Sequence, residues 1–142
     1  MKDLFSIKGK VALVTGGSRG IGEMIAAGFL ASGAKVYISS RKAEVCDATA
    51  ERLTKEYGGE CISLPSDLSN LGGIESLVTE LSNKESHLDI LINNAGAAWG
   101  APLDEYPENG WDKVMDTNVK GVFFLTQRLL PLLREGVKND PS

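Results

Sequence analysis

The chain has 142 residues, of which 42% are hydrophobic and 24% are charged, and its formal net charge is -4. This length suits one domain, residues 1–142, and the apolar runs are shorter than the roughly 20 residues that cross a bilayer. The basic residues form no stripe, which argues against nucleic acid as a partner. The start of the chain lacks the apolar core of a secretion signal, so we expect a cytoplasmic protein without membrane contact.

Short β-forming runs alternate along the chain with longer runs of helical periodicity, and glycines separate several of them. We expect strands at Lys10–Thr15, Lys35–Ser39, Glu60–Leu64 and Leu88–Asn93, and helices at Gly20–Ser32, Lys42–Tyr57, Leu71–Asn83 and Glu108–Leu133. Gly33 and Gly58 are placed to end the first two helices. This alternation predicts an α/β fold, a doubly wound parallel sheet with helices on both faces.

The first predicted strand runs directly into a glycine-rich turn, residues 16–22, and a helix follows. Gly16, Gly20 and Gly22 allow backbone N–H groups to approach a ligand without a Cβ in the way. The positive end of the following helix favours an anion at the same place. The turn therefore predicts a seat for the diphosphate of a dinucleotide.

The end of the second strand, Ser39-Ser40-Arg41, bears on the choice of dinucleotide. A site for NAD usually has a carboxylate here for the ribose hydroxyls, and this chain has none. Arg41, together with Arg19, offers guanidinium groups for a 2′-phosphate, which predicts NADP(H). The alternative is that both arginines are solvated surface charges.

Polar residues also follow the third and fourth strands. Asp67 is a candidate N-cap of the next helix, and Ser69 competes for that role. Asn93 and Asn94 need hydrogen-bond partners for their amides if they are buried. Because the carboxyl ends of parallel strands share one edge, we expect these residues to line the same ligand site.

The run from residue 108 to residue 133 is apolar over more than one stripe, which predicts a helix buried on two sides. Asn118 is a lone amide within it that we expect to be buried and that must therefore find partners, and Trp111 is expected to pack at its start. Trp99 fits either a site near the substrate entrance or the core. Cys46 and Cys61 lack the spacing of a zinc site, and His87, the single histidine, lies in a polar stretch. We therefore expect no metal site and a surface histidine.

These motifs together resemble the short-chain dehydrogenase/reductase family, and in particular its NADPH-dependent 3-oxoacyl-[acyl-carrier-protein] reductase-like members. The resemblance rests on TGGSRGIG at residues 15–22, Asp67-Leu68, NNAG at residues 93–96 and Asn118 in TNVKG. It implies a Rossmann-like sheet, and candidate cofactor contacts at Gly16, Ser18, Arg19, Gly20, Ile21, Gly22, Arg41, Asp67, Leu68, Asn94, Ala95 and Gly96.

The resemblance also implies individual roles. Asp67 would accept a hydrogen bond from the adenine amino group, Leu68 would pack on the ring, and the NNAG segment would join neighbouring strands and lie along the ribose. Asn118, the one catalytic candidate, would interrupt its helix and hold a water of the proton relay. The second apolar side of helix 108–133 would meet another subunit in a dimer or tetramer.

The family reaction moves a hydride between NADP(H) and a carbonyl, here a ketone or acyl thioester, and uses a Ser and a Tyr-x-x-x-Lys pair. At that spacing Tyr37 is followed by Arg41, Tyr57 by Cys61 and Tyr106 by Gly110, so none qualifies. We expect the N-terminal, cofactor-binding part of a longer reductase, with the C-terminal part of the family fold absent and the fourth strand left as an apolar edge. The alternative is a non-catalytic dinucleotide-binding module or sensor.

Overall fold

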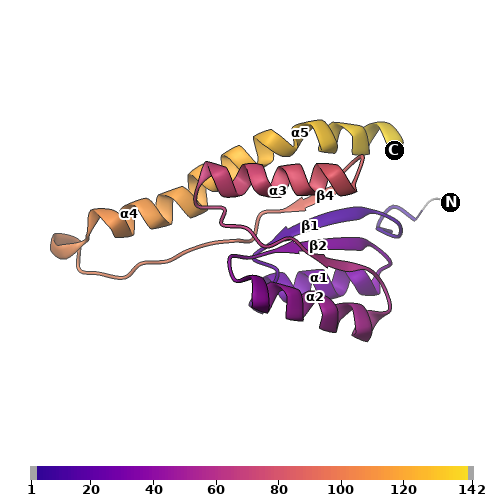
Figure 1. Cartoon of the computed structure of the whole chain (residues 1–142), viewed down its shortest axis with the longest axis horizontal. Helices are drawn as coiled ribbons and strands as arrows, with labels where there is room; N and C mark the ends of the chain where they lie inside the picture. The colour runs from indigo at the N-terminus through magenta and orange to yellow at the C-terminus, as the bar shows by residue number, and fades with distance from the viewer. Residues whose placement is uncertain (1–2, 141–142) are drawn as a thin grey trace.

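The computed structural model describes residues 3–140, which form a four-stranded parallel sheet flanked by helices (Figure 1). The strands are β1 (Val11–Thr15), β2 (Lys35–Ser39), β3 (Cys61–Ser63) and β4 (Ile90–Ile92). Their order is β3-β2-β1-β4, which confirms the doubly wound arrangement and leaves β4 at one edge of the described sheet. The four predicted strands all form, and β3 and β4 are shorter than expected.

Helices cover both faces of the sheet and divide the core in two. α1 (Gly20–Ala31) and α2 (Ala43–Tyr57) pack on one face, and α3 (Leu71–Lys84) and α5 (Gly121–Asn139) on the other (Figure 1). Successive side chains of a strand point to opposite faces, so Leu13 joins the core beneath α3 and α5 whereas Val14 joins the core beneath α1 and α2. This burial on both faces explains the continuous apolar character of β1.

The helix ends follow the glycine pattern in two cases and differ from the expectation in a third. Gly33 and Gly58 adopt the left-handed conformation just after α1 and α2, with φ of 87° and 69°. The predicted caps of α3 are wrong, because Asn70 is the N-cap and its side chain accepts a hydrogen bond from Gly73 N at 2.7 Å. Asp67 instead accepts hydrogen bonds from the backbone and hydroxyl of Ser69.

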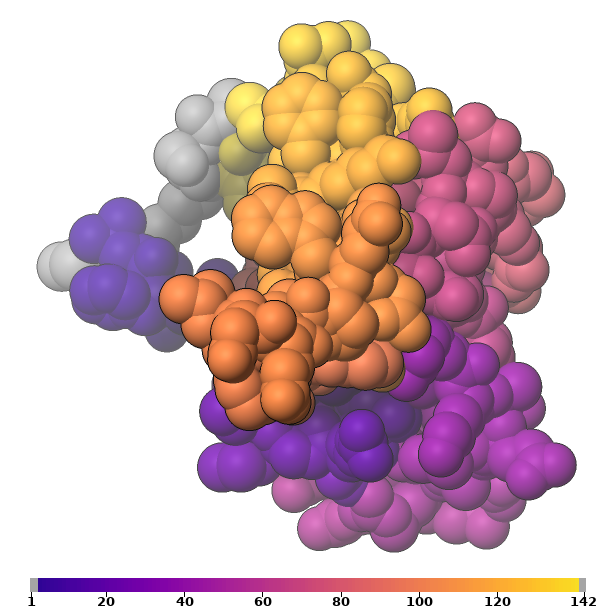
Figure 2. Space-filling model, turned by 90° about the vertical axis from the view of Figure 1, so that its left-hand side faces the viewer, coloured from indigo at the N-terminus to yellow at the C-terminus, as the bar shows by residue number. Residues whose placement is uncertain are grey.

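The predicted helix 108–133 is divided into three pieces. α4 (Glu108–Met115) leads into a π-helical turn, η2 (Asp116–Lys120), and then into α5, which continues to Asn139. A short 3-10 turn, η1 (Leu103–Glu105), precedes α4. We call residues 97–120, which include η1, α4 and η2, the arm. The arm extends beyond the sheet (Figure 1) and lies at the front of the view in Figure 2.

This helical run is buried on one side only in the single chain. Leu125 and Leu129 lie in the core, whereas Trp111, Val119 and Phe123 are 59%, 54% and 61% exposed. The expectation that Trp111 packs at the start of the helix is therefore wrong. Among the described residues, no helix is both long enough and apolar enough to span a membrane.

Candidate functional site

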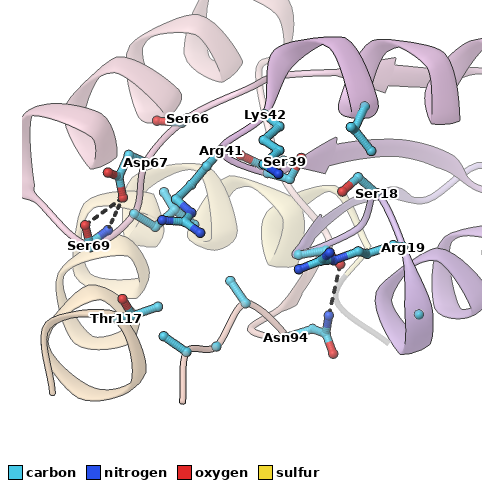
Figure 3. Close-up of a pocket in the computed structure, with 18 of the residues that line it drawn as sticks. Ser18, Arg19, Ser39, Arg41, Lys42, Ser66, Asp67, Ser69, Asn94 and Thr117 are labelled. Carbon is cyan, nitrogen blue, oxygen red and sulfur yellow. Dashed lines mark hydrogen bonds between the residues drawn. The ribbon is translucent and has the colours of Figure 1, made fainter. Parts of the chain in front are cut away.

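A cavity of about 480 Å³ opens at the carboxyl ends of the strands (Figure 3). Every strand of the sheet contributes to it through the loop that follows, and the arm closes one side. Its lining consists of Gly16, Ser18, Arg19, Gly20, Ser39, Ser40, Arg41, Lys42, Val45, Ser66, Asp67, Leu68, Ser69, Asn94, Ala95, Gly96, Ala97, Lys113 and Thr117. This is the edge at which open α/β sheets bind ligands.

The glycine-rich turn forms one wall of the cavity. Gly16 and Gly20 have φ of 62° and 58°, a conformation that L side chains rarely adopt. A Cβ on Gly22 would overlap the carbonyl oxygen of Gly16 and would lie 2.5 Å from Nδ2 of Asn94, so the start of α1 packs against the turn with no room for a side chain. Within the described residues, the N-cap Arg19 provides no side-chain cap, so the first-turn N–H groups stay available to a ligand.

Cationic side chains and unpaired hydroxyls gather at the end of β2. The guanidinium groups of Arg19 and Arg41 point into the cavity (Figure 3), and Lys42 lines it beside them. The Oγ atoms of Ser39 and Ser40 are buried and have no hydrogen-bond partner among residues 3–140. Buried hydroxyls normally have partners, so this end of β2 has unused hydrogen-bonding capacity beside positive charge.

Asp67 lies in the same cavity, on the side of Arg41 that faces away from Arg19 (Figure 3). The pKa of Asp67 lies below its ordinary value because Ser69 hydrogen-bonds its carboxylate and Arg41 adds a favourable charge, although burial acts in the opposite direction. Asp67 is therefore an ionised acceptor at neutral pH. Its neighbour Leu68 lines the cavity but is also 8% exposed and part of the core.

The NNAG segment joins β4 to β1 through Asn94 and Thr15. Thr15 Oγ1 accepts hydrogen bonds from Asn94 N at 3.0 Å and Ala95 N at 2.9 Å, and Asn94 Nδ2 donates to the carbonyl oxygens of Thr15 and Gly16 at 3.1 and 3.2 Å. The implied connection between neighbouring strands is thus confirmed. Asn93 is exposed and bonds Thr126 Oγ1 at 3.2 Å.

Asn118 lies in the π-helical turn, so it does interrupt the helix. Its Oδ1 accepts from Ala97 N and its Nδ2 donates to Ala97 O, both at 2.8 Å. The expectation of a buried amide is wrong, since Asn118 is exposed and finds its partners in the connection that follows NNAG. Asn118 therefore fixes Ala97, a residue of the cavity wall, from outside the lining.

Ten of the twelve predicted cofactor residues line the cavity. Ile21 is 70% exposed and Gly22 is buried in the contact with Gly16, so these two do not. The sequence reasoning missed four lining residues in the helical segments, namely Lys42, which is the N-cap of α2, Val45, Lys113 and Thr117. Lys113 and Thr117 lie one helical turn apart, and Thr117 directly precedes the candidate Asn118. This proximity to Asn118 is the sequence feature that could have pointed to both residues.

The geometry agrees with comparisons to known proteins. The chain is 53% identical over 140 residues to the rhamnolipids biosynthesis 3-oxoacyl-[acyl-carrier-protein] reductase of Pseudomonas aeruginosa, covering 99% of this chain and 54% of that protein. It is 40% identical over 125 residues to the gluconate 5-dehydrogenase of Gluconobacter oxydans, covering 88% and 48%. The chain thus spans about half the length of the curated relatives it matches.

Solved structures show the same half-length match. The Pseudomonas aeruginosa RhlG/NADP active-site complex superposes with a TM-score of 0.89 at 53% identity, over 96% of this chain and 52% of that one. L-sorbose reductase of Gluconobacter frateurii, complexed with NADPH and L-sorbose, gives 0.87 at 29% identity, over 92% and 49%. The profile of the family described as short chain dehydrogenase matches residues 10–139. The chain belongs to the short-chain dehydrogenase/reductase family.

Proposed function

We propose that this chain binds NADP(H) and provides the cofactor-binding part of a reductase that transfers hydride from NADPH to a ketone or 3-oxoacyl-type carbonyl. The observation that carries the proposal is a single cavity in which a Cβ-free glycine turn lies beside Arg19 and Arg41. No carboxylate stands at residues 39–41, where one would favour NAD. Relatives support the same cofactor, since two of the superposed structures are complexes with NADP or NADPH.

The residues present fit such a cofactor. The first-turn N–H groups of α1 and the positive end of its dipole suit the diphosphate. The unpaired hydroxyls of Ser39 and Ser40, with Arg41 and Lys42, suit the 2′-phosphate. Both phosphate sites lie in one cavity, so one dinucleotide can occupy them together.

The remaining contacts follow from the other walls of the cavity. The ionised Asp67 can accept a hydrogen bond from the adenine amino group. Asn94, Ala95 and Gly96 would lie along a ribose, and Asn118 would hold Ala97 and a water of the proton relay. When bound, NADPH supplies the hydride that reduces the carbonyl carbon of the substrate.

The complete reaction needs a tyrosine and a lysine four residues apart, and no tyrosine of this sequence has a lysine at that spacing. We place the Ser, Tyr and Lys outside these 142 residues, and take the substrate class from the relatives. The exposed Val119 and Phe123 support a homo-oligomer formed through helix 108–133. A cytoplasmic location stays a prediction.

Substitution of Arg41 tests the cofactor assignment. In Arg41→Ala we expect NADPH affinity to fall about 10- to 100-fold, the equivalent of roughly 1.5–3 kcal/mol for hydrogen bonds to a charged group, with NADH affinity unchanged. Fluorescence titration of the chain with each reduced cofactor measures both. Arg134→Ala, which removes an exposed arginine of α5, is the matched control. Equal NADPH affinity in the Arg41→Ala and parent chains would contradict the assignment.

A non-catalytic binding module is the second candidate, favoured by the lack of a Tyr-x-x-x-Lys pair in this sequence. Both candidates predict NADPH binding, and both predict that the chain by itself does not oxidise NADPH when a ketone is added. Ketone-dependent NADPH oxidation by the isolated chain would contradict both. Restored oxidation on adding the C-terminal half of a relative would favour the reductase.

A further inference from the structure

The glycine-rich turn is held from its inner side by α2. Thr49 Oγ1 donates a hydrogen bond to the carbonyl oxygen of Ser18 at 2.8 Å, and Thr49 and Ser18 are only 5% and 8% exposed. The preceding residue is fixed as well, because Gly17 N donates to Ser39 O at 3.3 Å. Two peptides of the turn, Gly16–Gly17 and Ser18–Arg19, are therefore bonded to β2 and α2 respectively.

The bond from Thr49 sets the direction of the next N–H group. In a trans peptide the carbonyl and the following N–H point in opposite directions, and residues 3–140 contain no cis peptide bond. Since the Ser18 carbonyl points inward to Thr49, the N–H of Arg19 points outward. Arg19 and Gly20 are exposed on that outer side and line the cavity. A flipped peptide would instead present a carbonyl oxygen to an anion.

α2 itself is fixed independently of this bond. Cys46 Sγ lies 3.5 Å from the carbonyl oxygen of Ile38, and Arg52 forms an ion pair with Glu23 of α1. Thr49 and Arg52 are three residues apart and so lie on the same side of α2. The helix can therefore serve as a rigid support for the turn.

We propose that Thr49 is a positioning residue for the cofactor diphosphate. Its hydroxyl holds the Ser18–Arg19 peptide with the Arg19 N–H directed at the phosphates. This inference rests on the proposed binding of NADP(H), and it assigns a role to a side chain that does not line the cavity.

The test compares two ligands. Thr49→Val keeps the shape of the side chain and removes the donor, so we expect NADPH affinity to fall about tenfold, the value of one hydrogen bond to a charged group. Affinity for adenosine 2′-monophosphate, which has no diphosphate, should not change, and Thr49→Ser should restore NADPH binding. Thr54→Val is the control, because Thr54 lies on the same helix but bonds Ala50 and Cys61.

A second measurement needs no cofactor. In the nitrogen–proton spectrum of the free chain, Thr49→Val should displace the amide resonances of Arg19 and Gly20, whereas Thr54→Val should leave them in place. Thr49→Ala replaces Thr49→Val if the latter does not fold. Equal losses for both ligands, or unmoved Arg19 and Gly20 resonances, would overturn the role of Thr49. A parent chain that does not bind NADPH would refute the proposed function, and the resonances would still decide the positioning.

Discussion

The two ends of the sheet differ in how far their polar side chains are paired with one another. At the amino end the groups satisfy one another: Glu85 accepts a hydrogen bond from Tyr37 Oη at 2.7 Å and pairs with Lys35 at 2.6 Å. Nearby, Asp89 accepts a hydrogen bond from Val11 N at 2.8 Å, which joins the starts of β4 and β1. These contacts leave little hydrogen-bonding capacity for a ligand.

At the carboxyl end several groups remain open. Of the buried side-chain atoms without a partner in residues 3–140, the hydroxyls of Ser39, Ser40 and Ser63 all belong to the ends of β2 and β3. The exception is Nδ1 of His87 at the amino end, whose Nε2 contacts Asp89 at 3.2 Å. A buried polar group without a hydrogen-bond partner is costly unless a ligand supplies that partner. We therefore call the carboxyl end of the sheet the binding end and the amino end the structural end.

The largest expected effect comes from Gly22→Ala at the binding end. The added Cβ would meet the carbonyl oxygen of Gly16, a backbone atom that cannot move aside. We expect the free energy of unfolding to fall by about 3 kcal/mol, at the upper end of the usual cost of overpacking, with loss of NADPH binding. Chemical denaturation and NADPH titration measure the two effects.

Gly28→Ala is the matched control for Gly22→Ala, since Gly28 lies on the same helix and a Cβ there meets nothing within 4 Å. Because glycine is unfavourable inside a helix, this change should raise the free energy of unfolding by roughly 0.5–1 kcal/mol. Similar stability changes at the two positions would show that the contact of α1 with the turn is not tight.

A smaller effect is expected from Glu85→Ala at the structural end. The substitution leaves the Tyr37 hydroxyl buried without its acceptor, which should lower the free energy of unfolding by about 1–3 kcal/mol. NADPH affinity of the folded chain should be unchanged, because none of these groups lines the cavity. Glu80→Ala, at an exposed position of α3, is the control. A change in NADPH affinity in Glu85→Ala would contradict the separation of the two ends.

Most of the binding end could be predicted from the sequence, because its determinants are local. Gly16 directly follows β1, Gly20 begins α1, Gly33 and Gly58 follow the ends of α1 and α2, and Arg41 lies two residues after β2. Right-handed crossovers then fix the strand order and bring the strand ends together. Neither the partners of the amino-end carboxylates nor the bond from Thr49 to Ser18 could be predicted, since each joins residues distant in sequence.

The arm shows the same limit. Its apolar pattern predicts one continuous helix, whereas the structure breaks that helix at Asp116–Lys120, where Asn118 bonds both backbone groups of Ala97. Only the resemblance implied the break. Local pattern also misplaced the cap of α3, because Asp67, Ser69 and Asn70 are all good N-cap types and only the backbone at Asn70 selects it.

The smallest expected effect is a pH dependence at the structural end. Burial and the neighbouring Glu85 raise the pKa of Tyr37 to about 12, from an ordinary value of 10.0. The pKa of Tyr37 is higher in the folded chain than in the unfolded chain, so the folded chain binds the phenol proton more tightly. The resulting stabilisation is fully present below pH 10.0 and is lost as the pH rises toward 12. Stability of the parent chain should therefore fall over this range more steeply than that of Tyr37→Phe.

Denaturation midpoints measured across that alkaline range for the parent and Tyr37→Phe chains check this expectation. Cys61, whose pKa is raised by burial, titrates in both proteins. The pKa of Lys35 is raised mainly by Glu85 and also by Tyr37, so the difference between the two curves reports Tyr37 together with its coupling to Lys35. Tyr57→Phe, at a tyrosine that is 39% exposed, should leave the parent curve unchanged. If the parent and Tyr37→Phe curves ran parallel from neutral to alkaline pH, Tyr37 and Glu85 would not be the closed pair that distinguishes this end of the sheet.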